Sequence, residues 1–179
     1  MIRTIINMLT ISRIFLALII FLLLVLGNSY LMAFILFFVA GLSDYFDGFL
    51  ARKYNVVSEI GEILDPIADK VLIVFIFFAL AVNLSSYLIG FMGSIIIARE
   101  IWVSALRDFN ARNNNISATK VIYLAKVKTT LQLFTISIYL FGLAFNKMIF
   151  IVFGDIFIVI SALITFYTGY LYTINTFDN

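Results

Sequence analysis

The chain has 179 residues, of which 64% are hydrophobic and only 12% are charged, with 12 Lys and Arg against 10 Asp and Glu. A soluble domain carries about 25% charged residues, so this composition excludes a water-soluble globule. Cysteine and histidine are both absent, which excludes disulfides, His-based catalytic triads and thiolate or imidazole metal ligands. A catalytic base must therefore be a carboxylate, a lysine or a tyrosine, and a metal site must use oxygen ligands, as Mg²⁺, Mn²⁺ and Ca²⁺ sites do.

Six mainly apolar segments are long enough to cross a bilayer as helices, because a spanning helix needs about 20 residues. They cover residues 9–26, 30–54, 59–82, 87–106, 126–144 and 148–172. The sequence therefore predicts an all-α polytopic membrane protein that forms a single domain over residues 1–179. Residues 2–12 either form a short interfacial helix before the first span or simply extend that span.

The basic residues are distributed unevenly about these six segments. Eleven of the 12 Lys and Arg lie before, between or within the segments toward one side, and only Lys147 falls on the other. Lys and Arg accumulate on the cytoplasmic side of membrane proteins. We therefore expect an integral membrane protein with both termini in the cytoplasm.

Four aspartates gather where the second and third segments approach the cytoplasmic side. Asp44 and Asp47 share one helical face, and Asp65 and Asp69 share another. A turn near residue 55 makes the two helices antiparallel neighbours, so the four carboxylates can face one another. Carboxylates crowded in a half-buried site must be protonated or bind cations. One or two divalent ions satisfy this requirement economically.

Other interpretations of the four carboxylates remain open at this point. They could form an intramembrane salt-bridge network, or line the pathway of a divalent-cation transporter or a proton pathway. Transport is disfavoured because all four crowd one side of the membrane and nothing acidic lines the rest of a path. A small membrane scaffold would leave the clustering unexplained.

The four aspartates belong to the pattern D-x2-D-G-x2-A-R-x8-G-x3-D-x3-D over residues 44–69. This pattern resembles the signature of the CDP-alcohol phosphotransferase family, and all eight fixed positions match. The resemblance implies six transmembrane helices in a bacterial-type inner membrane, an active site on the cytoplasmic side and a homodimer. Three further elements resemble the bacterial branch that forms phosphatidylglycerophosphate. They are Asn7-x2-Thr10-x2-Arg13, Ala98-Arg99-Glu100-Ile101 with Arg107, and Lys126-x-Lys128-Thr129-x2-Gln132.

The resemblance also implies roles for the signature residues. Asp44, Asp47, Asp65 and Asp69 would bind two divalent cations, Mg²⁺ or Mn²⁺, that hold the diphosphate of CDP-diacylglycerol. Asp69 would be the general base that activates the acceptor hydroxyl, and CMP would leave. The nucleotide would be bound by Gly48, Ala51, Arg52 and Gly61, with Asn7, Thr10 and Arg13 bordering the site.

The acceptor in the resembling branch is sn-glycerol 3-phosphate, a dianion that needs cations. The candidates are Arg99, Arg107, Lys126 and Lys128, with Arg107 and Lys126 forming the anion pocket; otherwise Arg107 and the two lysines are ordinary loop cations. Glu100 projects about 100° away from Arg99 around the helix, so we do not expect these two to pair. Phosphatidylglycerol, which would give cardiolipin, and inositol phosphate are alternative acceptors. Membrane lipids are expected partners and nucleic acid is not.

Overall fold

The computed structural model describes residues 2–54, 59–113 and 123–177, and within these ranges the side chains of 2–6, 47, 49–54, 59–60, 62–63 and 123–126 are not described. The described chain is helical apart from short turns and contains no strand. Its helices are α1 (Ile2–Val25), α2 (Tyr30–Tyr54), α3 (Glu59–Asn83), α4 (Tyr87–Arg112), α6 (Tyr123–Ala144) and α7 (Met148–Phe177). The predicted all-α class is confirmed.

Three tight turns join α1 to α2, α3 to α4 and α6 to α7, at the positions where polar residues interrupt the apolar runs. Each turn holds one residue in the left-handed region, with φ of 46° at Asn28, 49° at Ser85 and 51° at Asn146. Asparagine tolerates this region better than most residues, because its short polar side chain bonds locally. Ser86 then caps α4 by accepting the backbone N–H of Ile89 at 3.3 Å.

The helices pack around one main apolar core, and a second, smaller cluster of Val103, Leu106 and Tyr172 joins α4 to α7. α1 lies against α2 and α3, α4 against α3 and α7, and α6 against α2 and α7. The largest fully buried apolar side chains of the main core include Ile20, Leu24, Phe77, Ile96 and Leu140. In the described part of the chain, α2 and α3 do not pack directly against each other, although the sequence predicts them to be neighbours, because α1 packs against both of them. α3 also lies next to α4.

Many large apolar side chains point away from the core, for example Phe15, Phe91 and Phe166, which are 63%, 65% and 67% exposed. Such a surface suits contact with lipid. Within the described residues, four helices are long and apolar enough to cross a membrane: α4, α7, the 7–25 part of α1 and the 127–144 part of α6. The chain thus has the character of an integral membrane protein, and six spans remain a prediction. Residues 2–12 extend the first helix without a break.

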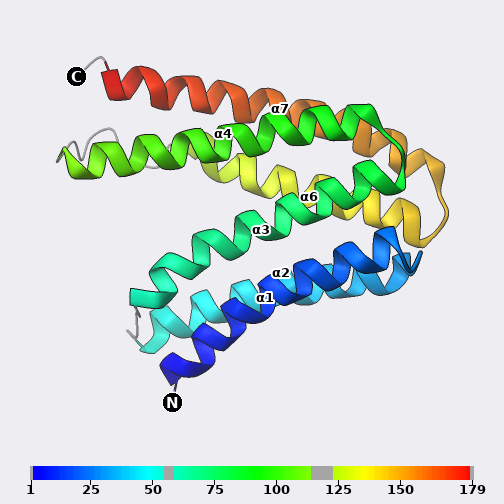
Figure 1. Ribbon diagram of the computed structural model, residues 1–179, viewed down its shortest axis with the longest axis horizontal. Helices are drawn as coiled ribbons and strands as arrows, with labels where there is room; N and C mark the ends of the chain where they lie inside the picture. Colours follow the sequence, from blue (N-terminus) through cyan, green and yellow to red (C-terminus); the bar gives the residue numbers. More distant parts are fainter. Residues whose placement is uncertain (1, 55–58, 114–122, 178–179) are drawn as a thin grey trace.

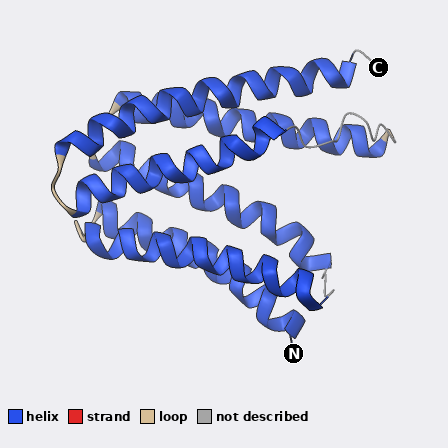
Figure 2. Cartoon of the chain, turned by 180° about the vertical axis from the view of Figure 1, so that it is seen from behind, coloured by secondary structure: helices blue, strands red, loops and turns tan. Residues whose placement is uncertain are grey.

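The helices converge at the end that carries the tight turns and spread apart toward the other end (Figure 1). The start of α1 and the end of α7 both lie at the spread end, and the view from behind gives the same arrangement (Figure 2). The signature residues of α2 and α3 also lie toward this end. The candidate site is therefore built where the helix groups separate.

Candidate active site

Arg13 of α1 lies at the centre of the aspartate cluster. Its side chain is only 1% exposed, and its Nη1 donates to the carboxylates of Asp44 on α2 and, at 2.6 Å, of Asp69 on α3. Its Nη2 lies 3.7 Å from Asp65 Oδ1. Thr10, one turn earlier on α1, donates to the same Asp65 oxygen at 2.8 Å. Three helices are thus tied together through charged side chains.

Sequence reasoning placed Arg13 only at the border of the nucleotide site and did not foresee it as the counter-ion of the aspartates. The available signal was the spacing of Thr10 and Arg13, which puts both on one face of an otherwise apolar helix. The face that contacts α2 and α3 is decided by packing, which the spacing alone does not reveal.

The other predicted contacts of the donor site are only partly described. Asn7 is half-buried, Gly61 is buried and Gly48 is partly buried. The side chains of Asp47, Ala51 and Arg52 lie outside the described part, so their predicted roles remain predictions.

The donor atoms of the aspartate cluster suit a hard divalent cation, because they are all carboxylate oxygens. Asp44, Asp65 and Asp69 already converge on one positive group, the Arg13 guanidinium. Among the side chains that are described, no group of three or more acidic residues is close enough to hold a metal ion by itself. The chemistry of the cluster therefore fits Mg²⁺ or Mn²⁺, whereas its described geometry is that of a carboxylate–guanidinium network.

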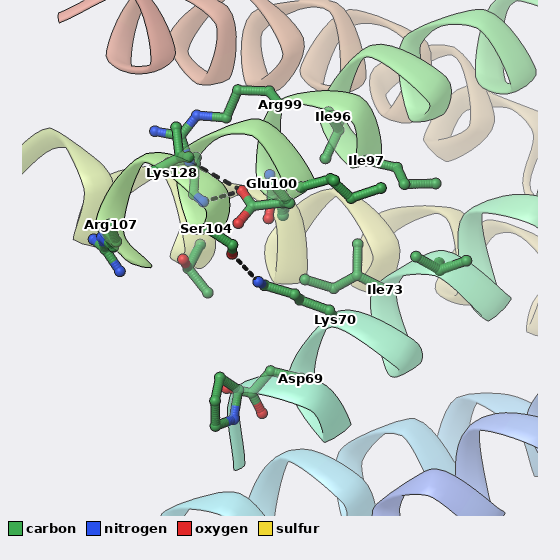
Figure 3. A pocket seen from close by; sticks show the side chains of 16 residues that line it. Asp69, Lys70, Ile73, Ile96, Ile97, Arg99, Glu100, Ser104, Arg107 and Lys128 are labelled. Atoms are coloured by element: carbon green, nitrogen blue, oxygen red, sulfur yellow. Dashed lines mark hydrogen bonds and ion pairs between the residues drawn. The ribbon is translucent and has the colours of Figure 1, made fainter. Parts of the chain in front are cut away.

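A cavity of about 720 Å³ opens beside Asp69, between α3, α4 and α6. Figure 3 shows its polar lining, which begins at Asp69 and passes Lys70 and Ser104 to Glu100 and Lys128. The remaining polar residues of the lining are Arg99, Arg107, Thr129 and Gln132. Three of the four cations predicted to bind the acceptor thus lie in the same cavity as the predicted base. The fourth, Lys126, has a side chain outside the described part.

Glu100 binds two of these cations. It accepts a hydrogen bond from Lys128 on α6 and another, at 3.2 Å, from Arg99 Nη1. The expectation that Glu100 would not pair with Arg99 is wrong. The long arginine side chain spans the angle between neighbouring positions on the helix, and because Arg99 and Lys128 are 7% and 6% exposed, neither can rely on water instead.

α7 supports the cations from behind the cavity. Arg99 Nη2 donates to Thr168 Oγ1 at 2.7 Å, and the Arg99 side chain crosses so close to Gly169 that a Cβ there would lie 2.9 Å from Arg99 Cγ. Arg107 Nη2 donates to the Tyr172 hydroxyl at 2.9 Å, with its guanidinium 5.2 Å from the ring centre. These contacts orient both guanidinium groups.

A helical membrane protein that gathers aspartates beside a cation-lined cavity has the features expected of an enzyme that works on phosphate groups at a membrane. The chain belongs to the CDP-alcohol phosphatidyltransferase family, whose sequence profile matches residues 3–167. Members of this family generally depend on divalent metal ions. The predicted family is therefore confirmed.

Individual relatives carry a more specific name. The CDP-diacylglycerol–glycerol-3-phosphate 3-phosphatidyltransferase of Rickettsia felis is 40% identical over 169 residues, which cover 93% of this chain and 91% of that protein. The protein of the same name from Rickettsia typhi is 39% identical over 169 residues, 93% of each chain. That of Escherichia coli is 40% identical over 99 residues, 55% of this chain and 54% of the relative.

Proposed function

We propose that this protein transfers the phosphatidyl group of CDP-diacylglycerol to sn-glycerol 3-phosphate, giving phosphatidylglycerophosphate and CMP. The observation that carries the proposal is the single cavity that joins Asp69 to Arg99, Arg107 and Lys128. An acceptor with a hydroxyl at one end and a phosphate at the other matches a cavity with a carboxylate at one end and cations further along. The names of the relatives support the same substrates.

In the proposed reaction, the acceptor hydroxyl oxygen forms a bond to the phosphorus that carries diacylglycerol. The bond from that phosphorus to the oxygen of CMP breaks, and the hydroxyl proton passes to the Asp69 carboxylate, which acts as general base. Asp44, Asp47, Asp65 and Asp69 would hold two divalent cations, Mg²⁺ or Mn²⁺. Such ions would supply positive charge that neutralises the diphosphate and the charge that develops on the leaving CMP.

The chain's other side chains position the two substrates. Gly48, Ala51, Arg52, Gly61, Asn7 and Thr10 would border the nucleotide, and Arg107, Lys126, Arg99 and Lys128 would bind the acceptor phosphate. Because Glu100 neutralises part of the charge of Arg99 and Lys128, Arg107 offers the acceptor a guanidinium whose described hydrogen-bond partner is an uncharged hydroxyl. The enzyme would work as a homodimer in a bacterial inner membrane, with the spread end of the helices facing the cytoplasm.

The test is CMP release from CDP-diacylglycerol by the purified protein with Mg²⁺ or Mn²⁺, with each acceptor added separately. We expect release with sn-glycerol 3-phosphate in preference to phosphatidylglycerol or inositol phosphate. Asp69→Asn should abolish it, because the variant lacks the base. Asp108→Asn makes the same change at a side chain that is 62% exposed and should leave release intact. No CMP with any acceptor would show that the proposed reaction is wrong.

A further inference from the structure

The cavity beside Asp69 carries an excess of positive charge. Its charged lining residues are Asp69, Lys70, Arg99, Glu100, Arg107 and Lys128, so four cations face two carboxylates. The formal excess of two positive charges would balance the two negative charges of a phosphate monoester dianion. The cavity is thus complementary in charge to an anionic ligand, and the distribution of its cations indicates where the anion sits.

The excess charge is not spread evenly over the four cations. Glu100 forms ion pairs with Lys128 and Arg99, whereas Arg107 donates a hydrogen bond to the uncharged hydroxyl of Tyr172. Lys70 donates to the hydroxyl of Ser104, and among the described side chains no carboxylate lies within ion-pair distance of its ammonium. A half-buried ammonium that has only a neutral partner is poorly compensated in a membrane protein. Lys70 and Arg107 are therefore the two cavity cations best placed for an incoming anion.

We propose that Lys70, positioned by Ser104, is a ligand of the acceptor's phosphate and sets the preference for anionic acceptors. The proposal rests on the proposed function and adds to it a residue of α3 that sequence analysis did not assign to the acceptor.

The geometry of α3 favours this role. Asp69 and Lys70 are consecutive, so their side chains diverge by about 100° around the helix. In Figure 3, Lys70 reaches from α3 toward Ser104 of α4, while Asp69 lies apart from it on the same helix. One turn of α3 thus offers a base to the hydroxyl and a cation to the phosphate of a short acceptor.

The surroundings of Lys70 distinguish the acceptor from the nucleotide as its ligand. The cavity that Lys70 lines is completed by α4 and α6, whereas the residues expected to border the nucleotide lie on α1, α2 and the start of α3. An ammonium has three N–H donors, and Ser104 takes one of them. The donors that remain can bind phosphate oxygens.

The test compares Lys70→Gln with wild-type protein in the CMP-release assay, with the acceptor and the lipid donor varied separately. Loss of a charge-assisted contact to phosphate should raise the KM for sn-glycerol 3-phosphate by about tenfold or more. The KM for CDP-diacylglycerol should stay within about twofold of wild type, because Lys70 is proposed to contact the acceptor and contributes little to binding of the lipid donor. Lys70→Arg, which keeps the charge, should recover much of the loss. Lys147→Gln, the same change at an exposed lysine in the α6–α7 turn, is the matched control and should behave as wild type.

Several results would overturn the proposal. One is an unchanged KM for the acceptor in Lys70→Gln, and another is an equal rise in both KM values. Binding of sn-glycerol 3-phosphate, measured by calorimetry on the full chain, separates this proposal from the proposed function. If wild type releases no CMP but binds sn-glycerol 3-phosphate, the proposed reaction is wrong, and weaker binding by Lys70→Gln still supports Lys70 as a phosphate ligand. If wild type does not bind sn-glycerol 3-phosphate, the proposed reaction and the proposed role of Lys70 are both wrong.

Discussion

Replacement of Arg13 by glutamine tests whether its guanidinium holds the aspartate cluster together. Arg13 is buried, and its described contacts include two charge-assisted hydrogen bonds, to Asp44 and Asp69. Each such bond contributes about 1.5–3 kcal/mol. The two carboxylates are 53% and 51% exposed, so water screens part of the interaction and the lower bound applies. We therefore expect Arg13→Gln to lower the free energy of unfolding by about 3 kcal/mol.

The assay is thermal unfolding of the purified protein in detergent, followed by circular dichroism in EDTA. A change of about 3 kcal/mol corresponds to a midpoint about 6–12 °C lower in a chain of this size. Arg112→Gln is the matched control, because Arg112 and its partner Asp108 are 77% and 62% exposed. An exposed pair contributes about 0.5 kcal/mol or less, so this control should unfold close to wild type.

A second arm repeats the measurement with Mn²⁺. The ions proposed for the same carboxylates would supply positive charge in place of the lost guanidinium. The difference in unfolding midpoint between Arg13→Gln and wild type should therefore be smaller with Mn²⁺ than in EDTA. If Arg13→Gln lowers the unfolding midpoint in EDTA no more than Arg112→Gln does, Arg13 does not tie the three helices together. If the difference in midpoint between Arg13→Gln and wild type is the same with and without Mn²⁺, the metal does not bind the carboxylates at Arg13.

Three further predictions concern other parts of the fold. Glu100→Gln leaves two buried cations without their carboxylate, so it should lower the free energy of unfolding by about 2–3 kcal/mol. It should also weaken acceptor binding, measured as a higher KM for sn-glycerol 3-phosphate. An unaltered unfolding midpoint would contradict this prediction. Gly154→Ala puts a Cβ 2.6 Å from an aromatic ring of α6 and should lower stability by about 1–3 kcal/mol, whereas Gly41→Ala, with open space around its Cβ, should raise it by about 0.5–1 kcal/mol. Because the chain lacks cysteine, a membrane-impermeant maleimide should label Ser85→Cys but not Phe177→Cys in intact cells, and the reverse pattern would invert the proposed orientation.

The helices could be predicted closely because apolar run length and turn residues are local properties. The second helix is predicted over 30–54 and observed at Tyr30–Tyr54. The largest differences are at the start of α1, which begins at Ile2 where the first span is predicted from 9, and at the ends of α4 and α7, which are predicted at 106 and 172 but reach Arg112 and Phe177. The extensions of α4 and α7 depend on contacts between the two helices. These extensions are polar and stabilise each other, since Asn110 Nδ2 donates to Thr176 Oγ1 at 2.8 Å. A hydropathy profile averages over neighbouring residues, so it cannot predict a hydrogen bond between residues 66 positions apart.

The candidate site was predictable to a smaller extent, for the same reason. The spacing of the aspartates showed which of them share a helical face, because that spacing follows from the geometry of one helix. The pairing of Arg13 with Asp44 and Asp69 depends on how α1 packs, and the pairing of Glu100 with both Arg99 and Lys128 depends on side-chain reach and on the position of α6. Tertiary packing decides each of these contacts.

Because α7 supports Arg99 and Arg107, we expect that substitutions on α7 can change which acceptor the enzyme uses. In the described part of the chain, α7 contributes no residue to the cavity lining, yet Thr168, Gly169 and Tyr172 fix the course of both guanidinium groups. A genetic selection for altered acceptor use should therefore recover substitutions on α7 that touch neither substrate. A comparison of relatives restricted to substrate-contacting positions would overlook them.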